Sequence, residues 1–265
     1  MTNKVLITGA NKGIGFEVAK QLGAQGWSIL LGARNEQRGL AAVHELEKQG
    51  IQAEWLKIDL DDLNTVHAAA ADVAERHPDL NLLINNAGIA GDMAAEPLTV
   101  KTDDLRETLT VNVIGSFEMI KAFTPILRKN HGRIANMTIP VNPSGFWHPF
   151  SYVTSKSALD KMIEMFGQSF KRQHIPVDIF GIMPGGVSTD LNHHMTNPFI
   201  HTVEEGAAIV VKIVTDGHHH QAKLSTTTGW ANWSSGWSVP IPNNRPKVMA
   251  NAVAAVHVNL VYLSQ

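Results

Sequence analysis

The sequence predicts an α/β fold in which one doubly wound parallel sheet carries helices on both faces, as a single domain. Three observations indicate this fold. Short apolar runs alternate with longer amphipathic stretches through most of the chain. The apolar runs are continuous, as in strands that are buried on both faces. A glycine-rich turn directly follows the first run, where a strand would pass into a helix.

Each element is expected where its pattern lies. Apolar runs predict strands at 5–7, 28–31, 53–58, 80–84, 133–137 and 177–183. Amphipathic stretches predict helices at 13–22, 36–49, 63–76, 103–129 and 151–172. Gly50 follows the second of these helices and Gly132 the fourth, and glycine is common just past the end of a helix. Right-handed crossovers would then place helices on both faces of the sheet.

This α/β domain is expected to span residues 1–217, and an atypical segment at 218–265 is expected to pack on it. The later segment has no clear period, and its stretch 229–244 is rich in Ser, Thr, Trp, Gly and Pro. Trp230, Trp233 and Trp237 are expected at a pocket mouth, at an interface or in packing.

Composition excludes several classes of protein. The formal net charge of -2 leaves no basic field that would favour nucleic acid or an anionic membrane. The absence of cysteine excludes disulfides and thiolate metal sites. We expect a cytoplasmic protein, because the first residues lack the apolar stretch of a secretory signal. The apolar stretch at 248–263 is short and interrupted by polar residues, so no spanning helix is expected.

Tyr152 and Lys156 lie four residues apart in a predicted helix, so their side chains share one helix face. A phenol has a pKa near 10, and it exchanges a proton readily only when its surroundings lower that pKa. A neighbouring ammonium does so by favouring the phenolate. The pair therefore indicates general acid and base chemistry, although such pairs also occur on helices without an active site.

The turn after the first strand reads Thr8-Gly9-Ala10-Asn11-Lys12-Gly13-Ile14-Gly15. Its glycines let the backbone approach a pyrophosphate, and the N-terminus of the following helix favours anions. The strand–turn–helix context predicts a dinucleotide site, and the alternative is a purely structural turn. The cofactor-binding residues expected here are Gly9, Asn11, Lys12, Gly13, Ile14 and Gly15.

Two further strand ends are expected at the same edge of the sheet. Asp59, followed by Leu60, is expected to hold an adenine amino group or else to cap the next helix. The run Asn85-Asn86-Ala87-Gly88 suits either a cofactor ribose or an ordinary turn, since its residues are small and flexible. Asn86, Ala87 and Gly88 are therefore further cofactor-binding candidates.

With Asn112 in Thr110-Val111-Asn112-Val113, these motifs resemble the short-chain dehydrogenase/reductase family over about residues 3–215. The resemblance implies a Rossmann-type fold and a nicotinamide cofactor that supplies the hydride. It implies that Tyr152 exchanges a proton with the substrate oxygen. Lys156 would lower the phenol pKa and hold the nicotinamide ribose, and Asn112 would support a water linked to the lysine. Residues expected beside the nicotinamide are Pro184, Gly185, Val187 and Thr189.

The cofactor is expected to be NADPH/NADP+. Members of the family that use NAD usually carry an acidic residue at the end of the second strand, where this sequence has Arg34 and Asn35. Arg34 and Lys12 favour a ribose 2′-phosphate, unless both are only solvated surface charges. The pattern is similar to that of NADPH-dependent carbonyl reductases.

One residue departs from the family pattern. The family usually has a serine thirteen residues before the tyrosine, and this sequence has Ile139 there. Thr138 and Ser144 are candidates to replace its hydroxyl, although strand alternation turns Thr138 the other way. The expected substrate residues are Ile139, Ser144, Phe146 and Trp147, and Val141 and Phe150 extend the same apolar set, which would otherwise belong to the core.

Histidines at 193–194 and 218–220 are adjacent, and adjacent side chains diverge on a strand or turn. We expect no carboxylates at ligand spacing around them, and therefore solvated loops and no metal site.

The sequence thus predicts an NADPH-dependent oxidoreductase that interconverts a carbonyl and a secondary alcohol on a small to medium apolar substrate. The alternative is a homologue with impaired hydride transfer, because Ile139 replaces the serine, that acts as a sensor or partner protein. Neither nucleic acid nor a membrane is expected as a partner. The resemblance implies a homodimer or homotetramer that forms through the helices at 103–129 and 151–172.

Overall fold

The computed structural model describes residues 3–139, 149–196, 200–226 and 229–232. Its largest sheet has eight strands in the described residues. They are β1 (Lys4–Thr8), β2 (Ser28–Ala33), β3 (Ala53–Lys57), β4 (Leu82–Asn85), β5 (Arg133–Met137), β6 (Asp178–Ile182), β9 (Lys223–Thr226) and β10 (Gly229–Asn232). Their order is β10-β9-β6-β5-β4-β1-β2-β3, and every neighbouring pair is parallel except the antiparallel β10 and β9.

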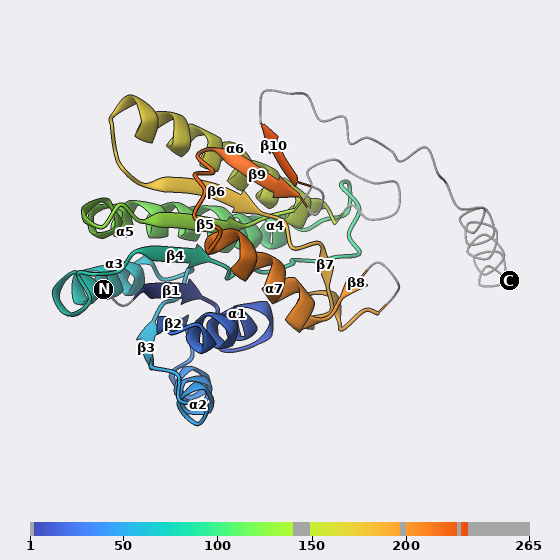
Figure 1. Ribbon diagram of the computed structural model, residues 1–265. Coiled ribbons are helices and arrows are strands. Elements are labelled where there is room, and N and C mark those ends of the chain that lie inside the picture. Colours follow the sequence, from blue (N-terminus) through green and yellow to red (C-terminus); the bar gives the residue numbers. More distant parts are fainter. Residues whose placement is uncertain (1–2, 140–148, 197–199, 227–228, 233–265) are drawn as a thin grey trace, which may run out of the picture. The chain divides into compact units, whose positions relative to one another are not determined.

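Helices cover both faces of this sheet (Figure 1). They are α1 (Gly13–Ala24), α2 (Glu36–Glu47), α3 (Leu63–Arg76), α4 (Thr102–Leu109), the π-helix η1 (Thr110–Gly115), α5 (Ser116–Lys129), α6 (Phe150–Arg172) and α7 (Val203–Val214). A short 3₁₀ turn, η2 (Asp190–Asn192), lies between the strands of a two-stranded sheet, β7 (Gly186–Val187) and β8 (Ile200–His201). No helix in the described ranges is both long enough and apolar enough to cross a membrane.

Side-chain alternation along the strands builds a separate core on each face of the sheet. In β1, Val5 and Ile7 join the core that also contains residues of α1, α2 and α7, whereas Leu6 joins the core of α3, α5 and α6. All three side chains have no exposed area. A strand buried on both faces has no polar side, which explains the continuous apolar runs of the sequence.

The strand order places a topological switch point between β1 and β4. From β1 the chain builds toward β2 and β3, and from β4 it builds toward β5 and β6 in the opposite direction. The loops after such strands separate and leave a crevice at the carboxyl edge of the sheet, where open α/β sheets bind ligands.

The structure differs from the sequence prediction at several elements. The helix expected at 103–129 is divided into α4, η1 and α5. The helix α7 was not among the expected elements, nor was the strand β9, which pairs with β6 and brings part of the late segment into the sheet. β9 is only four residues long and mixes polar with apolar residues, so its pattern is weak until pairing with β6 stabilises it. Residues 233–265, including Trp233 and Trp237, lie outside the described part of the chain.

Candidate active site

Tyr152 and Lys156 lie one turn apart near the start of α6, and their side chains are almost fully buried, with 7% and 4% exposed. The Lys156 Nζ donates a hydrogen bond to the carbonyl oxygen of Met137 at 2.7 Å, and it lies 5.7 Å from the centre of the Tyr152 ring. Met137 is the last residue of β5. The pair therefore sits at the carboxyl edge of the sheet, where the sequence predicts a catalytic site.

Burial shifts the two titratable groups in opposite directions. It raises the pKa of Tyr152 to about 12, and it lowers the pKa of Lys156 to about 8, because a buried site disfavours the charged form of each group. In this arrangement burial outweighs the lowering of the phenol pKa that the sequence predicts from the neighbouring ammonium.

Asn112 joins this pair to the loop that follows β4. Its side chain is 1% exposed and is carried by the π-helix η1. The Oδ1 accepts from the backbone N–H of Ile89 at 2.8 Å, and the Nδ2 donates to the Ile89 carbonyl at 2.8 Å and to the Ser155 Oγ at 2.9 Å. Ser155 directly precedes Lys156, so Asn112 fixes the start of α6 against η1. Single π turns are common at functional sites.

The glycine turn packs closely against the end of β4. Gly9 has a φ of +65°, and a Cβ placed on it would lie 3.0 Å from the Ala87 Cα. A Cβ on Gly15 would lie 2.5 Å from the Asn86 Nδ2. Thr8 adds to this contact, because its Oγ1 accepts the backbone N–H groups of Asn86 and Ala87 at 3.0 Å each. The two predicted cofactor motifs are therefore side by side, at the switch point.

Gly88 brings these motifs to Asn112 and Lys156. A Cβ at this position would lie 3.0 Å from the Asn112 Oδ1 and 3.8 Å from the Lys156 Nζ. The run that ends β4 thus approaches both Asn112 and Lys156, and it forms one continuous edge from the glycine turn to the lysine.

The ends of β2 and β3 lie farther along this edge. Arg34 is exposed, and the Asn35 side chain caps α2 by accepting the backbone N–H of Arg38 at 2.9 Å. The N-cap of α3 is Asp62, whose side chain accepts the N–H of Asn64. The alternative that Asp59 caps this helix is therefore wrong.

Asp59 instead folds onto its own turn. Its Oδ1 accepts a hydrogen bond from the backbone N–H of Asp61 at 3.2 Å, and its own backbone N–H donates to the Thr65 Oγ1 at 2.8 Å. Leu60, 5% exposed, packs in the core, where a Cβ on Gly115 would lie 2.5 Å from its Cβ.

The segment after β6 crosses the glycine turn. The Thr189 methyl lies 3.9 Å from the position of a Cβ on Gly13, and Asp190 forms an ion pair with Lys12. Pro184 and Val187 are buried, whereas Gly185 is exposed. The Asp190 contact had no signal in the sequence, because it joins residues far apart in the chain.

Thr138 does not replace the missing serine in this arrangement. Its side chain is 3% exposed, and its Oγ1 donates a hydrogen bond to the Asp160 Oδ1. A hydroxyl has one proton to donate, so Thr138 has none left for a substrate carbonyl. Ile139 is half-buried. The remaining expected substrate residues, Ser144, Phe146 and Trp147, lie outside the described part of the chain, as does Val141.

The histidine run at 218–220 is only partly solvated. His218 and His219 are exposed, but His220 is 3% exposed, which makes the prediction of a solvated loop wrong at this residue. Its Nε2 lies 2.7 Å from the Asp216 Oδ2, and its ring meets the Phe180 ring edge-on at 5.3 Å. Within the described ranges, no group of three or more His, Asp or Glu side chains is arranged to hold a metal.

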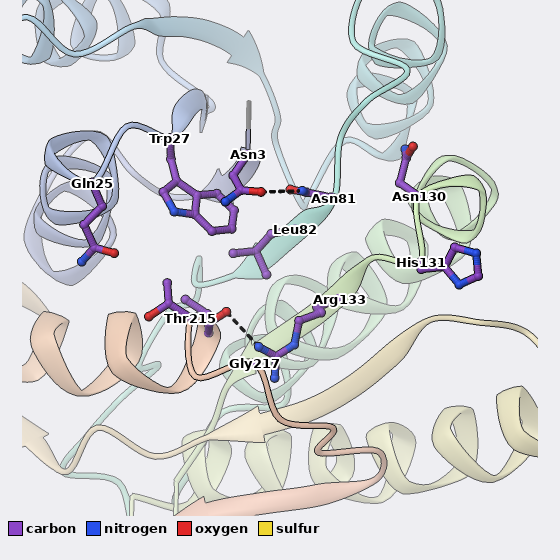
Figure 2. A pocket seen from close by; sticks show the side chains of 11 residues that line it. Asn3, Gln25, Trp27, Asn81, Leu82, Asn130, His131, Arg133, Thr215 and Gly217 are labelled. Atoms are coloured by element: carbon purple, nitrogen blue, oxygen red, sulfur yellow. Dashed lines mark hydrogen bonds between the residues drawn. The ribbon is translucent and has the colours of Figure 1, made fainter. Parts of the chain in front are cut away.

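A cavity of about 460 Å³ lies at the opposite, amino edge of the sheet, where β1, β4 and β5 begin (Figure 2). Arg133 lines it, and its guanidinium donates to the carbonyls of Val214 at 2.8 Å and His218 at 2.9 Å. Asp178 and Asp216 lie at 3.5 and 3.7 Å from this guanidinium. None of the expected site residues lines this cavity, and its arginine is already paired within the fold.

The motifs, their order and their convergence at one edge of the sheet agree with a comparison against protein families. A family profile described as short chain dehydrogenase matches residues 3–198. The chain belongs to the short-chain dehydrogenase family.

This short-chain dehydrogenase is similar to several characterised proteins. A short-chain dehydrogenase of Penicillium roqueforti is 33% identical, and the match covers 80% of this chain and 88% of the relative. A 3β-hydroxysteroid dehydrogenase of Mediterraneibacter gnavus is 29% identical over 71% of this chain and 67% of the relative.

Solved structures agree with the fold of this short-chain dehydrogenase. The NADPH-bound carbonyl reductase from chicken fatty liver superposes with a TM-score of 0.77 at 25% identity, over 88% of this chain and 99% of that one. An alcohol dehydrogenase of the archaeon Thermococcus sibiricus, complexed with 5-hydroxy-NADP, gives a TM-score of 0.71 at 26% identity, over 80% and 90%.

Proposed function

We propose that this protein is an NADPH-dependent oxidoreductase that interconverts a carbonyl and a secondary alcohol on a small to medium apolar substrate. The observation that carries the proposal is the approach of Asn112 and Lys156 to Gly88, beside the glycine turn, with the Tyr152 ring 5.7 Å from the Lys156 Nζ. The likeness to an NADPH-bound carbonyl reductase supports the same reading.

The cofactor fits the residues present. Gly9 and Gly15 pack the turn tightly against the end of β4, whereas a Cβ on Gly13, which has a φ of +58°, would meet only the Thr189 methyl at 3.9 Å, so the backbone there is open to a pyrophosphate. When bound, NADPH supplies the hydride that reduces the carbonyl carbon. The residues that would hold it are Gly9, Asn11, Lys12, Gly13, Ile14, Gly15, Arg34, Asn35, Asp59, Leu60, Asn86, Ala87, Gly88, Tyr152, Lys156, Pro184, Gly185, Val187 and Thr189.

The residues of the chain would handle the proton and the charge. In the reducing direction, the Tyr152 hydroxyl donates its proton to the carbonyl oxygen, and the phenolate that remains is stabilised by the Lys156 ammonium. Asn112 holds the loop after β4 and the start of α6 in register, so that the lysine stays beside Gly88.

The preference for NADPH over NADH would rest on Lys12 and Arg34, which offer positive charge to a 2′-phosphate. Both side chains are accessible, but the ammonium of Lys12 is paired with Asp190. We infer that the 2′-phosphate competes with this carboxylate for the lysine.

The test is NADPH oxidation by the purified protein against a panel of ketones and aldehydes. Tyr152→Phe should lower turnover by roughly 10²-fold or more and still bind NADPH, because it removes only the transferable proton. Tyr262→Phe, at the second tyrosine of the chain, is the matched control and should retain turnover. Equal turnover in wild type and Tyr152→Phe would contradict the assignment of the proton donor.

A second candidate is a cofactor-binding homologue with impaired hydride transfer that acts as a sensor or partner protein. Ile139 cannot donate a hydrogen bond, and Thr138 donates its own to Asp160, so the donor that usually orients the carbonyl is absent from both positions. Losing one such donor costs about 10²–10³ in rate. NADPH binding without turnover of any carbonyl or alcohol would favour this candidate.

We further propose that the protein forms a homodimer or homotetramer through η1, α5 and α6. Ile114, Phe117 and Met165 are exposed apolar side chains on these helices, at 47%, 37% and 63%. Exposed apolar side chains that gather on one surface mark interfaces. Light scattering after size exclusion should give a mass above 28.9 kDa, and Met165→Glu should lower it toward the monomer.

A further inference from the structure

Asp160 is a buried carboxyl group in α6, one turn after Lys156, and only 1% of its surface is exposed. Side chains on a helix lean toward its N-terminus. The carboxyl group of Asp160 therefore covers the turn that carries Lys156. The proposed proton transfer uses Tyr152, Lys156 and Asn112 and leaves this acid without a role.

Two consecutive residues at the end of β5 hold the two side chains. The carbonyl of Met137 accepts the hydrogen bond from the Lys156 Nζ at 2.7 Å, and the Thr138 Oγ1 donates to the Asp160 Oδ1. The lysine and the acid are thus held by consecutive residues, Met137 at the end of β5 and Thr138 directly after it.

The second oxygen of Asp160, Oδ2, is buried and has no hydrogen-bond partner. The Thr138 side chain that holds the other oxygen has apolar neighbours: a Cβ on Gly181 of β6 would meet the Thr138 methyl at 3.0 Å and the Leu224 side chain of β9 at 2.5 Å. Burying a carboxylate in such a place is costly unless an opposite charge lies nearby.

Lys156 is that charge. Among the described residues, the interactions that shift the Asp160 pKa come from Thr138, just after β5, and from Lys156 on its own helix. Gly181 of β6 and Leu224 of β9 lie on the methyl side of Thr138, and neither residue titrates. Tyr152, on the other side of Lys156, is the remaining titratable group of the cluster.

We propose that Asp160 is a positioning residue whose ionised carboxylate, held by Thr138, keeps Lys156 protonated and directed at Met137 beside Tyr152. The effect on catalysis rests on the proposed function. The effect on the charge of Lys156 does not, because it follows from the arrangement of the protein without substrate.

In the pair of Lys156 and Asp160, each group in its charged form favours the charged form of the other. Burial lowers the pKa of Lys156 and raises that of Asp160, to about 7. The Asp160 carboxylate raises the pKa of Lys156 and so counteracts its lowering by burial. The Thr138 hydrogen bond and the Lys156 charge lower the pKa of Asp160 and so counteract its raising by burial. Loss of the carboxylate therefore moves the Lys156 titration to lower pH. Loss of the Thr138 hydroxyl does the same, because Asp160 then ionises less readily.

The experiment follows Lys156 directly by NMR of the full chain labelled with [ε-¹³C]lysine, with the resonance assigned by its loss in Lys156→Met. Asp160→Asn should move the Lys156 titration to lower pH by roughly one pH unit or more. Thr138→Val should move it in the same direction, whereas Thr138→Ser, which keeps the hydroxyl, should titrate as the wild type does. If Asp160→Asn does not fold, the comparison of Thr138→Val with Thr138→Ser tests the proposal.

An unchanged Lys156 titration in Asp160→Asn would overturn the proposal, whatever the turnover. If that variant does not fold, an unchanged titration in Thr138→Val would overturn it. A shifted titration in a protein that reduces no carbonyl supports it and refutes the proposed function instead. When turnover is present, the high-pH limb of kcat/KM should move to lower pH in Asp160→Asn together with the NMR titration. A loss of rate at all pH values with no such movement would indicate a purely structural role and would also overturn it.

Discussion

Lys12 and Asp190 form an ion pair that connects the glycine turn after β1 to the short turn η2 after β7. Both side chains are more than half exposed, at 59% and 54%. Asp190 is also paired with the His194 Nε2 at 2.7 Å, and the pKa of its carboxyl is lowered by the hydrogen bond from Lys12. The pair spans the same turn that would cover the pyrophosphate of the cofactor.

Asp190→Asn should tighten NADPH binding by roughly two- to fivefold, the range expected for losing a competing exposed carboxylate. NADH, which has no 2′-phosphate, should gain less. Titration of cofactor fluorescence at low and at high salt measures both effects, and the gain should shrink at high salt. Asp103→Asn, at an exposed ion pair on α4, serves as the control. Weaker NADPH binding in Asp190→Asn would show that the carboxylate supports the cofactor site.

Asn112→Leu should destabilise the protein by about 1–3 kcal/mol, because it leaves the partly buried N–H and carbonyl of Ile89 without their partners. Turnover should fall by roughly tenfold or more, as the start of α6 loses its attachment at Ser155. Urea denaturation measures the first effect and NADPH oxidation the second. Asn64→Leu, at an exposed asparagine in α3, should change both values little. A loss of turnover in Asn112→Leu without a loss of stability would separate the two roles.

Gly9→Ala should cost about 2–4 kcal/mol of stability and abolish tight NADPH binding. Gly9 has a φ of +65°, and its new Cβ would also meet the Ala87 backbone at 3.0 Å. Gly26→Ala is the matched control, because Gly26 has a φ of +85° with nothing within 4 Å of a Cβ. It should cost only about 1 kcal/mol from backbone strain and leave cofactor binding intact. Equal costs for the two variants would mean that the contact with Ala87 is not tight.

The stability of Lys156→Met relative to that of the wild type should be greater at pH 7 than at high pH. The pKa of Lys156 in the folded protein, about 8, lies below its ordinary value of 10.5, so the folded state holds this proton less readily than the unfolded chain does. This difference in pKa lowers the free energy of unfolding of the wild type. The loss of stability is complete below pH 8, becomes smaller as the pH rises from 8 to 10.5, and is absent above pH 10.5.

The difference in unfolding free energy between Lys156→Met and wild type should therefore fall by about 1–3 kcal/mol over that interval. Denaturation curves at a series of pH values provide the measurement. Lys161→Met, at an exposed lysine on the same helix, should show no such pH dependence. A flat difference for Lys156→Met would mean that the buried lysine titrates near its ordinary pKa.

Local patterns in the sequence predict most of the sheet and the pairing of Tyr152 with Lys156 on one helix. The helix at 63–76 and the strand at 133–137 have the predicted bounds, because both combine a strong period with clear end signals. The π turn within 103–129 has no such signal, because its apolar period continues through it. β9 is specified by its pairing with β6 rather than by its own residues.

The parts of the candidate site that the sequence missed are long-range contacts. Asp190 reaches Lys12, and Ile89 reaches Asn112, only after the crossovers are folded. Asp160 is different, because its helical spacing from Lys156 was visible in the sequence. Nothing in the spacing indicated that the acid would be buried against Thr138, since that depends on the approach of β5.

The π-helix η1 also limits how this chain can vary in length. A π turn holds one residue more than an α turn, so deleting one residue between 110 and 115 would let η1 close as an α turn. Met119, Ile120 and Phe123, which have no exposed area, could then stay in the core, but Asn112 would turn away from Ile89. Deletions should therefore be tolerated in the surface loops long before they are tolerated in this one wide turn, because the extra residue directs the Asn112 amide at Ile89.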